Sequence, residues 1–163
     1  MKKLSYYIFL LVSIMFAACA ETVRDAKQEN SFPTIFPDYV GVTIPANIAP
    51  MNFCMQDRAA IMIDAVISDN KGTKLLHGQG KETTDFDSKK WHELISQHQG
   101  DSLQVSVSAK YNDGWHSYQP FCIYVSQDNI DYGVVYRKIE PGYEVYSKMG
   151  IYERDLSSFQ ETA

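Results

Sequence analysis

The sequence predicts an all-β fold: an immunoglobulin- or fibronectin-like antiparallel sandwich with one inserted helix and a Tyr-rich, irregular or helical C-terminal tail. Three observations carry this prediction. Apolar side chains alternate with other residues at 61–67 and 103–109, the period of a strand with one buried face. The period changes to that of a helix at 88–98. An Asn-Asp-Gly turn at 112–114 marks a hairpin, and short strands joined by turns are typical of a sandwich.

The pattern divides the chain into four parts. Residues 1–18 are a predicted signal peptide, and 19–31 are a predicted lipid anchor and polar tether. Residues 32–127 form the predicted sandwich, since domains of this class need about 100 residues. Residues 128–163 form a Tyr-rich tail that we interpret as a docking segment.

The leader has the composition of an export signal. The apolar run from Leu4 to Phe16 is shorter than the roughly 20 residues that span a bilayer, and it suits the core of a signal peptide. The junction Ala17-Ala18-Cys19 resembles the bacterial lipoprotein signal, in which Cys19 is acylated. The alternative is ordinary cleavage nearby, which leaves Cys19 a free thiol. We therefore expect an exported protein of the cell envelope, lipid-anchored to a bacterial membrane, with the outer membrane as the first choice.

Composition and charge exclude two classes of protein. The 163 residues carry a formal net charge of -5, with a sequence pI near 5.3, whereas nucleic-acid binding needs a basic surface. The hydrophobic fraction of 45% excludes wholesale disorder. We expect a globular, acidic domain without a nucleic-acid partner.

The first half of the predicted sandwich holds four strand signals. Residues 39–44 are β-branched and lie between prolines, which favours an edge strand. Residues 51–55 alternate as a half-buried strand does. The strongest β run covers 59–68. The turn residues at 69–72 then predict a partner strand at 73–79.

A single helix is predicted over 88–98. Asp87 or Ser88 can cap its N-terminus, and Gly100 suits the left-handed residue that follows a helix. Its apolar side consists of Trp91, Leu94 and Ile95.

The second half of the sandwich is a predicted hairpin. The strand at 103–109 alternates strictly, and the turn at 112–114 leads into a returning strand at 115–126. Pro120 lies within the returning strand. Because proline cannot donate to the ladder, it favours an edge position or a bulge.

The tail differs from the sandwich. Several of its apolar residues have helical spacing, so we predict short helical or irregular pieces that pack by their aromatic rings. Tyrosine is favoured at protein interfaces because its ring is apolar and its tip is polar. The alternative is that the tail wraps the sandwich. The docking candidates are Tyr132, Tyr136, Tyr143, Tyr146 and Tyr152.

No catalytic signature is present. The sequence holds no nucleophile elbow, no phosphate loop and no dinucleotide fingerprint, so we expect a protein that is not an enzyme and that needs no cofactor. His77, His92, His98 and His116 lack the spacing of a zinc site, and we interpret them as solvated surface groups. No catalytic residue or metal ligand is predicted.

Two weaker site hypotheses involve the hairpin and the cysteines. Tyr111, Trp115 and Tyr118 could form an aromatic platform for a glycan, although aromatic residues on a hairpin also pack across strands. Cys54 and Cys122 could form a disulfide in an oxidising compartment. The alternation places both thiols opposite the core-facing side chains, which disfavours the bridge.

Three segments carry a resemblance to a known family: Pro37–Phe53, Tyr136–Glu144 and Met149–Arg154. Over nearly all of its mature length the chain resembles the N-terminal region of Gram-negative cell-envelope proteins that continue into a TolB-like, WD-type β-propeller. Members are often labelled cytochrome c biosynthesis proteins, because a Cys-x-x-Cys-His segment follows the Tyr-rich stretch. The sequence stops before that segment, so the resemblance implies a truncated or split member. It supplies no catalytic residues.

The functional expectation follows from the leader and this resemblance. We expect a non-enzymatic interaction or scaffold domain of a cell-envelope lipoprotein, which would precede a propeller in complete relatives. Its partners would be a membrane and a protein, or the missing propeller. The alternatives are a carbohydrate-binding sandwich and a redox accessory that lacks its haem segment.

Overall fold

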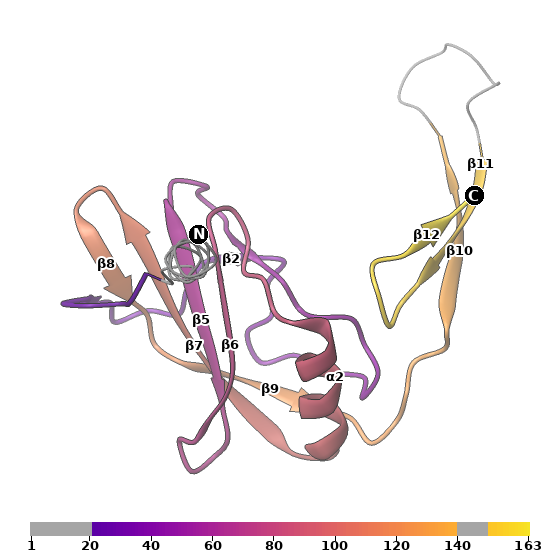
Figure 1. Ribbon diagram of the computed structural model, residues 1–163, viewed down its shortest axis with the longest axis horizontal. Helices are drawn as coiled ribbons and strands as arrows, with labels where there is room; N and C mark the ends of the chain where they lie inside the picture. Colours follow the sequence, from indigo (N-terminus) through magenta and orange to yellow (C-terminus); the bar gives the residue numbers. More distant parts are fainter. Residues whose placement is uncertain (1–20, 140–149) are drawn as a thin grey trace, which may run out of the picture.

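The computed structural model describes residues 21–139 and 150–163, and the structural statements below concern these residues. They are mostly β, with one helix, several antiparallel sheets and no closed barrel (Figure 1). This arrangement is consistent with an all-β sandwich. The predicted fold class, with a single inserted helix, is confirmed.

The centre of the main sheet is three antiparallel strands. They are β5 (Met62–Ser68), β6 (Lys74–Gly80) and β7 (Ser102–Tyr111), with β5 in the middle. The predicted turn joins β5 to β6, and Asp69 closes it by accepting hydrogen bonds from the backbone N–H groups of Lys71 and Thr73. The hairpin predicted at this point is confirmed.

The returning strand after β7 is split in two. Its parts, which both pair antiparallel with β7, are β8 (Gly114–Ser117) and β9 (Phe121–Val125). Between them the three residues 118–120 lie opposite only two residues of β7, 106 and 107. An extra residue on one strand is a β-bulge. It falls at Pro120, as the missing N–H of proline predicts.

Short strands border this sheet. At its edges β1 (Lys27–Gln28) runs parallel to β8, and β3 (Thr43–Ile44) runs parallel to β9. The predicted edge strand at 39–44 is thus reduced to two residues. A separate two-stranded pair joins β2 (Ile35–Phe36) to β4 (Cys54–Met55), which is all that forms of the strand predicted at 51–55.

The helix α2 (Ser88–Gln97) confirms the predicted N-cap and apolar side, and its C-cap is His98. Asp87 is the N-cap and accepts a hydrogen bond from the N–H of Lys90 at 2.8 Å. Gly100 follows the helix with a φ of +81°. Trp91 has no exposed surface, and its indole N–H donates to the carbonyl of Ile48 at 2.9 Å. The helix therefore fastens the loop before β4 as well as covering the sheet.

The hydrophobic core lies on one face of the main sheet, which we call the helix face, and both α2 and the 35–55 segment contribute buried side chains to it. Alternation along β5 and β7 sends every second side chain to this face. Those side chains are almost wholly buried: Ile63, Ala65, Ile67, Leu103, Val105, Val107 and Ala109.

The N-terminal segment crosses the other face of the sheet from residue 21 and ends in β1 at the sheet edge. We call residues 21–29 the strap and this face the strap face. The register places Asp64, Lys110 and Trp115 on it, because residues directly opposite in antiparallel strands share a face. The polar composition of the segment predicted a tether and gave no sign of β1, because a two-residue strand needs only backbone hydrogen bonds.

The tail is a three-stranded antiparallel sheet, which we call the tail sheet. It consists of β10 (Gly133–Lys138), β11 (Gly150–Asp155) and β12 (Glu161–Thr162), and it stands apart from the main sheet (Figure 1). The predicted irregular or helical tail was therefore wrong. Helical spacing of a few apolar residues is also compatible with a strand exposed on both faces, where no buried face imposes alternation.

The two described cysteines are free thiols. The prediction that both point away from the core was wrong for Cys54, which is buried within the hydrophobic cluster. Its Sγ lies 3.3 Å from the carbonyl of Phe36 on the paired strand β2. The alternation argument failed because Phe53, Cys54 and Met55 are all buried, so this strand has no solvent face. Among the described residues, no helix is long and apolar enough to cross a membrane.

Candidate functional site

The hairpin aromatics do not form a single platform. The register places Tyr111 on the helix face and Trp115 on the strap face, where Trp115 is 7% exposed. Tyr118 joins Tyr111 only, with their hydroxyl oxygens 3.2 Å apart. A sugar ring therefore cannot stack on all three side chains together, since one is buried on the opposite side of the sheet.

The two tyrosines border a small cavity beside the core. Burial, with the neighbouring hydroxyl of Tyr118 as the next cause, raises the pKa of Tyr111 well above its ordinary value. The Tyr111 hydroxyl also donates to the carboxylate of Asp57 at 3.3 Å. The cavity of about 360 Å³ is lined by Thr34, Met55, Gln56, Asp57, Tyr111 and Tyr118. A neutral phenol that is already paired is a packing group and not a base.

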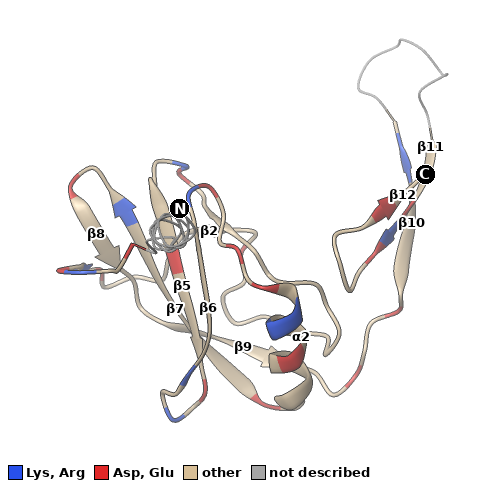
Figure 2. Ribbon diagram, in the orientation of Figure 1, with Lys and Arg blue, Asp and Glu red and all other residues tan. Residues whose placement is uncertain are grey.

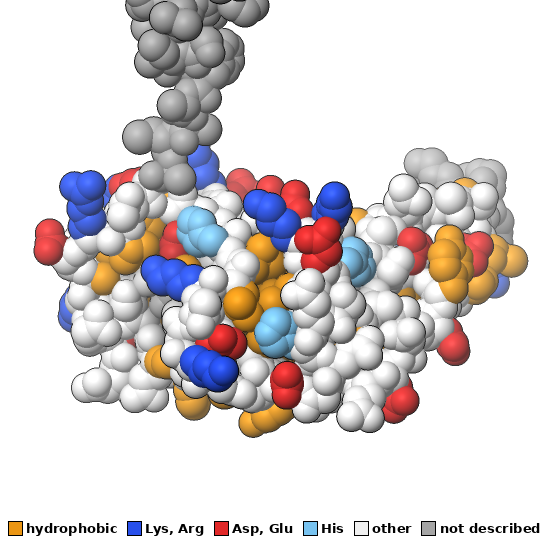
Figure 3. Space-filling view, turned by 60° about the horizontal axis from the view of Figure 1, so that its bottom comes forward, with side chains coloured by type: hydrophobic (Ala, Val, Ile, Leu, Met, Phe, Trp, Pro, Cys, Tyr) orange, Lys and Arg blue, Asp and Glu red, His pale blue; other side chains and the backbone are white. Residues whose placement is uncertain are grey.

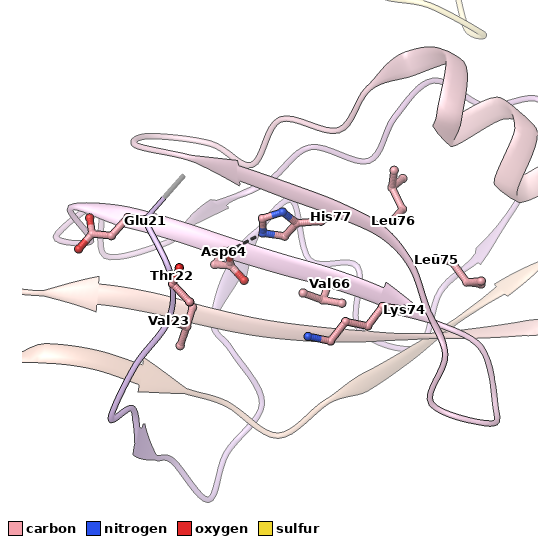
Figure 4. Close-up of a pocket in the computed structure, with 9 residues that line it drawn as sticks. All are labelled: Glu21, Thr22, Val23, Asp64, Val66, Lys74, Leu75, Leu76 and His77. Atoms are coloured by element: carbon pink, nitrogen blue, oxygen red, sulfur yellow. Dashed lines mark hydrogen bonds and ion pairs between the residues drawn. The ribbon is translucent and has the colours of Figure 1, made fainter. Parts of the chain in front are cut away.

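The strap face carries an open groove of about 500 Å³ (Figure 4). Its most polar feature is Asp64, which accepts from Gln79 at 3.0 Å and lies 2.6 Å from His77 Nε2. Asp64 is largely buried, whereas the His77 side chain is half exposed. The groove is lined by Glu21, Thr22, Val23, Asp64, Val66, Lys74, Leu75, Leu76 and His77. No sequence motif marks this carboxylate–imidazole pair, which the antiparallel pairing of β5 and β6 brings together.

Of the remaining histidines, His92 and His116 join distant segments, whereas His98 bonds within the end of α2. His92 Nε2 lies 2.9 Å from the carbonyl of Ser157 in the tail, and His98 Nδ1 lies 2.9 Å from the carbonyl of Leu94. His116 lies between Glu29 and Asp113, and its side chain is 13% exposed. The interpretation of these residues as solvated surface groups was wrong for His116, because carboxylates on both sides hold it against the sheet.

Exposed apolar side chains concentrate on the tail. Of the eleven large hydrophobic side chains that are exposed in the described residues, six belong to it. Figure 3 shows apolar side chains at this end of the molecule, at the right of the view. The six are Tyr132, Val134, Val135, Ile139, Ile151 and Phe159. Of these, the docking hypothesis named only Tyr132.

The tail sheet has an inner and an outer face. The inner face, with Val134, Tyr136 and Arg154, lines a groove of about 640 Å³ shared with the loops around β3 and β4. Because successive residues of a strand point to opposite faces, Val135 and Ile151 lie on the outer face, where they are 66% and 70% exposed. Val134 and Val135 after Gly133, and Ile151-Tyr152 after Gly150, were the β-favouring residues that could have revealed these two strands.

The named tyrosines divide between these surroundings. Tyr136 and Tyr152 are directly opposite each other, with ring centroids 6.2 Å apart, and the Lys138 ammonium lies 4.4 Å from the Tyr152 ring. These two rings are therefore cross-strand partners on the inner face. Cys19, Tyr143 and Tyr146 lie outside the described residues.

The root of the tail is fastened to the main domain. The Asn47 amide bonds both backbone groups of Ile130, donating to its carbonyl at 3.0 Å and accepting from its N–H at 2.8 Å. The N–H of Ala49 donates to the carbonyl of Leu156 at 2.9 Å. The tail thus neither wraps the sandwich nor hangs free, because polar contacts hold it at its base.

The charge pattern offers no concentrated site. Acidic and basic residues are scattered over the described elements (Figure 2). Within residues 21–139 and 150–163, no three His, Cys, Asp or Glu side chains are placed to hold a metal ion. Comparisons with protein-family models, curated proteins and solved structures gave no match.

Proposed function

We propose that this chain is a bacterial cell-envelope lipoprotein whose all-β domain is a non-enzymatic interaction module. It is anchored through acylated Cys19 and docks a protein partner through its tail sheet. The observation that carries the docking role is the set of exposed apolar side chains on that sheet. The anchor rests on the Ala17-Ala18-Cys19 junction behind a short apolar run.

The outer face of the tail sheet has the composition of an interface. Val135 lies opposite Glu153, and Ile151 lies opposite Arg137, so the two apolar side chains are diagonal neighbours within contact range. The charged residues border them. An apolar centre with a charged rim is typical of protein interfaces, and adjacent exposed apolar side chains mark one more strongly than scattered ones do.

The resemblance suggests the class of partner. In the proteins that this chain resembles, a β-propeller follows the Tyr-rich stretch to which the tail sheet belongs. A propeller domain, supplied by another chain or by a continuation of this one, is the partner we propose. The pair Asp64–His77 at the strap face joins β5 to β6, and the pair Tyr111–Tyr118 joins the two sides of the hairpin. Such contacts stabilise the fold, which suits a scaffold.

Replacement of Ile151 tests the docking role. In gently solubilised cell envelopes, we expect the wild-type protein to migrate in native electrophoresis as an assembly larger than the chain. Ile151→Asp should release the chain, because a carboxylate cannot be buried unpaired in an interface. The matched control is Phe32→Asp, at a residue that is 51% exposed in the main domain. Equal migration of Ile151→Asp and wild type would show that this face does not dock.

Replacement of Cys19 tests the anchor separately. Wild-type protein should incorporate labelled palmitate and sediment with membranes. Cys19→Ser should do neither, since single polar substitution removes the acylated atom and leaves the domain unchanged. Unchanged membrane association of Cys19→Ser would show that lipid does not anchor the protein.

A further inference from the structure

Glu21, the first residue that the structure describes, makes polar contacts with the strap face. The Gln79 side chain donates to the carbonyl of Glu21 at 2.7 Å, and the Glu21 carboxylate forms an ion pair with Lys110. Gln79 is itself oriented by its second hydrogen bond, to Asp64 at 3.0 Å. Residue 21 is therefore held at a defined place on the sheet (Figure 4).

The other end of the strap is fastened as well. There β1 pairs with β8, and the N–H of Glu29 donates to the carbonyl of Ser117 at 2.8 Å. The Glu29 carboxylate lies 2.8 Å from His116 Nδ1 and 3.1 Å from the Lys27 ammonium. Residues 21–29 thus lie along the domain between two sets of polar contacts and do not act as a spacer.

The fastened strap leaves little chain between the domain and the anchor. Cys19 is two residues before Glu21, and an extended chain spans at most about 3.6 Å per residue, so the two Cα atoms are within about 7 Å. A free flexible tether of the whole segment 19–31 would instead reach about 20 Å. A lipid on Cys19 cannot let the domain move away from the bilayer while the Glu21 contacts hold.

We propose that acylated Cys19 holds the strap face against the phospholipid surface, with the helix face turned away from it. This inference rests on the proposed lipid anchor. The strap face presents Lys74, an exposed cation at the groove, to lipid phosphates, and the half-exposed His77 lines the same groove. The tail sheet lies at the far end of the molecule from β1 (Figure 1), so membrane contact and partner docking use separate surfaces.

Tryptophan probes on the two faces test the orientation. Lys74→Trp places a ring on the strap face, and Lys89→Trp places one on the exposed side of α2; both residues are exposed lysines. The native Trp91 and Trp115 are buried and give a background that the wild-type protein measures. The full lipidated chain is reconstituted into phosphatidylethanolamine and phosphatidylglycerol vesicles with brominated acyl chains. We expect roughly twofold or greater quenching of Lys74→Trp relative to Lys89→Trp, since interfacial groups approach the acyl boundary.

A longer connection between Cys19 and Glu21 provides the control for this test. Ten Gly-Ser residues inserted between Ala20 and Glu21 add about 17 Å of reach, which should abolish the difference between the probes. Equal quenching in the chain without the insertion would overturn the proposed orientation while leaving the anchor intact. Failure of the anchor itself gives a different result, because the chain would then carry no palmitate label and would not incorporate into the vesicles.

Discussion

The main domain and the tail sheet are stabilised by different interactions. In the main domain, β5 and β7 share a face on which seven side chains are at most 4% exposed, and α2 and the 35–55 segment contribute to the same buried cluster. In the tail, none of the described residues from 128 to 163 is fully buried. Its strands are held by ladder hydrogen bonds, one stacked tyrosine pair and the polar contacts at Asn47 and Ala49.

This difference assigns the two regions different roles: the main domain supplies folding stability, and the tail sheet exposes apolar side chains. Burial of apolar surface supplies most of the free energy of folding, at roughly 25 cal/mol per Å². The main domain has such a core, whereas a small sheet without one is marginally stable. The tail sheet therefore depends on the main domain for its position, and its apolar side chains stay available to a partner.

The largest expected effect is in the core. Trp91→Ala should lower the free energy of unfolding by about 3–5 kcal/mol, because it removes a fully buried ring and its hydrogen bond to Ile48. Urea denaturation of the chain lacking residues 1–20 measures the change. A loss below about 1 kcal/mol would mean that the helix does not contribute to the core as its burial indicates.

The second prediction concerns the root of the tail. Limited proteolysis should cut the tail first and leave the main domain as a resistant fragment, since low local stability exposes backbone to protease. Asn47→Ala should accelerate that cut by roughly tenfold, because two hydrogen bonds to Ile130 are lost at about 1 kcal/mol each or less. Mass spectrometry identifies the fragments. Survival of main domain and tail together as one resistant core would mean that the tail is integral to the fold.

The same contrast explains what the sequence could predict. Alternation predicted β5 and β7 because one face of each strand is buried and the other is not, and the helix was marked by Asp87 and its apolar stripe. In the tail no face is buried, so selection for alternation is weak and the helical interpretation was equally compatible. The strap was missed for a related reason, since β1 is held by backbone groups that carry no side-chain pattern.

The candidate sites were less predictable than the fold. The pair Asp64–His77 is thirteen residues apart in sequence, and only the register of β5 and β6 brings it together. Trp115 and Tyr118 are both hairpin aromatics close to Tyr111 in sequence. Tyr118 contacts Tyr111, whereas the pleat places Trp115 on the opposite face of the sheet. Which side of a sheet an aromatic residue occupies depends on register, and hairpin composition does not show it.

The third prediction is a pH dependence at the strap. Hydrogen bonding to Glu29 raises the pKa of His116, while His116 lowers the pKa values of Glu29 and Asp113. A raised histidine pKa contributes stability below its unfolded value, near 6.5, which is lost as pH rises through the folded value. The lowered carboxyl pKa values contribute stability above their unfolded values, near 4, which is lost as pH falls through the folded ones.

The contacts of His116 should therefore be strongest at about pH 5–6. The difference in urea midpoint between wild type and His116→Gln is the measurement, because it removes pH effects common to both chains. We expect a small maximum near pH 6 that declines toward pH 8 and toward pH 3. A difference independent of pH would show that His116 acts by packing and not by charge.

The smallest expected effect is at Ile151, and it separates interface from core most directly. Its side chain is 70% exposed on the outer face of the tail sheet, so the isolated domain gains almost nothing by burying it. Ile151→Asp should change the free energy of unfolding by no more than about 0.5 kcal/mol, as surface substitutions usually do. The same substitution should release the proposed partner, because burial of the carboxylate in that interface would cost about 2 kcal/mol or more. Urea denaturation beside native electrophoresis measures both. If Ile151→Asp destabilises the isolated domain as much as a core substitution, the outer face is covered in the domain itself and cannot be the docking surface.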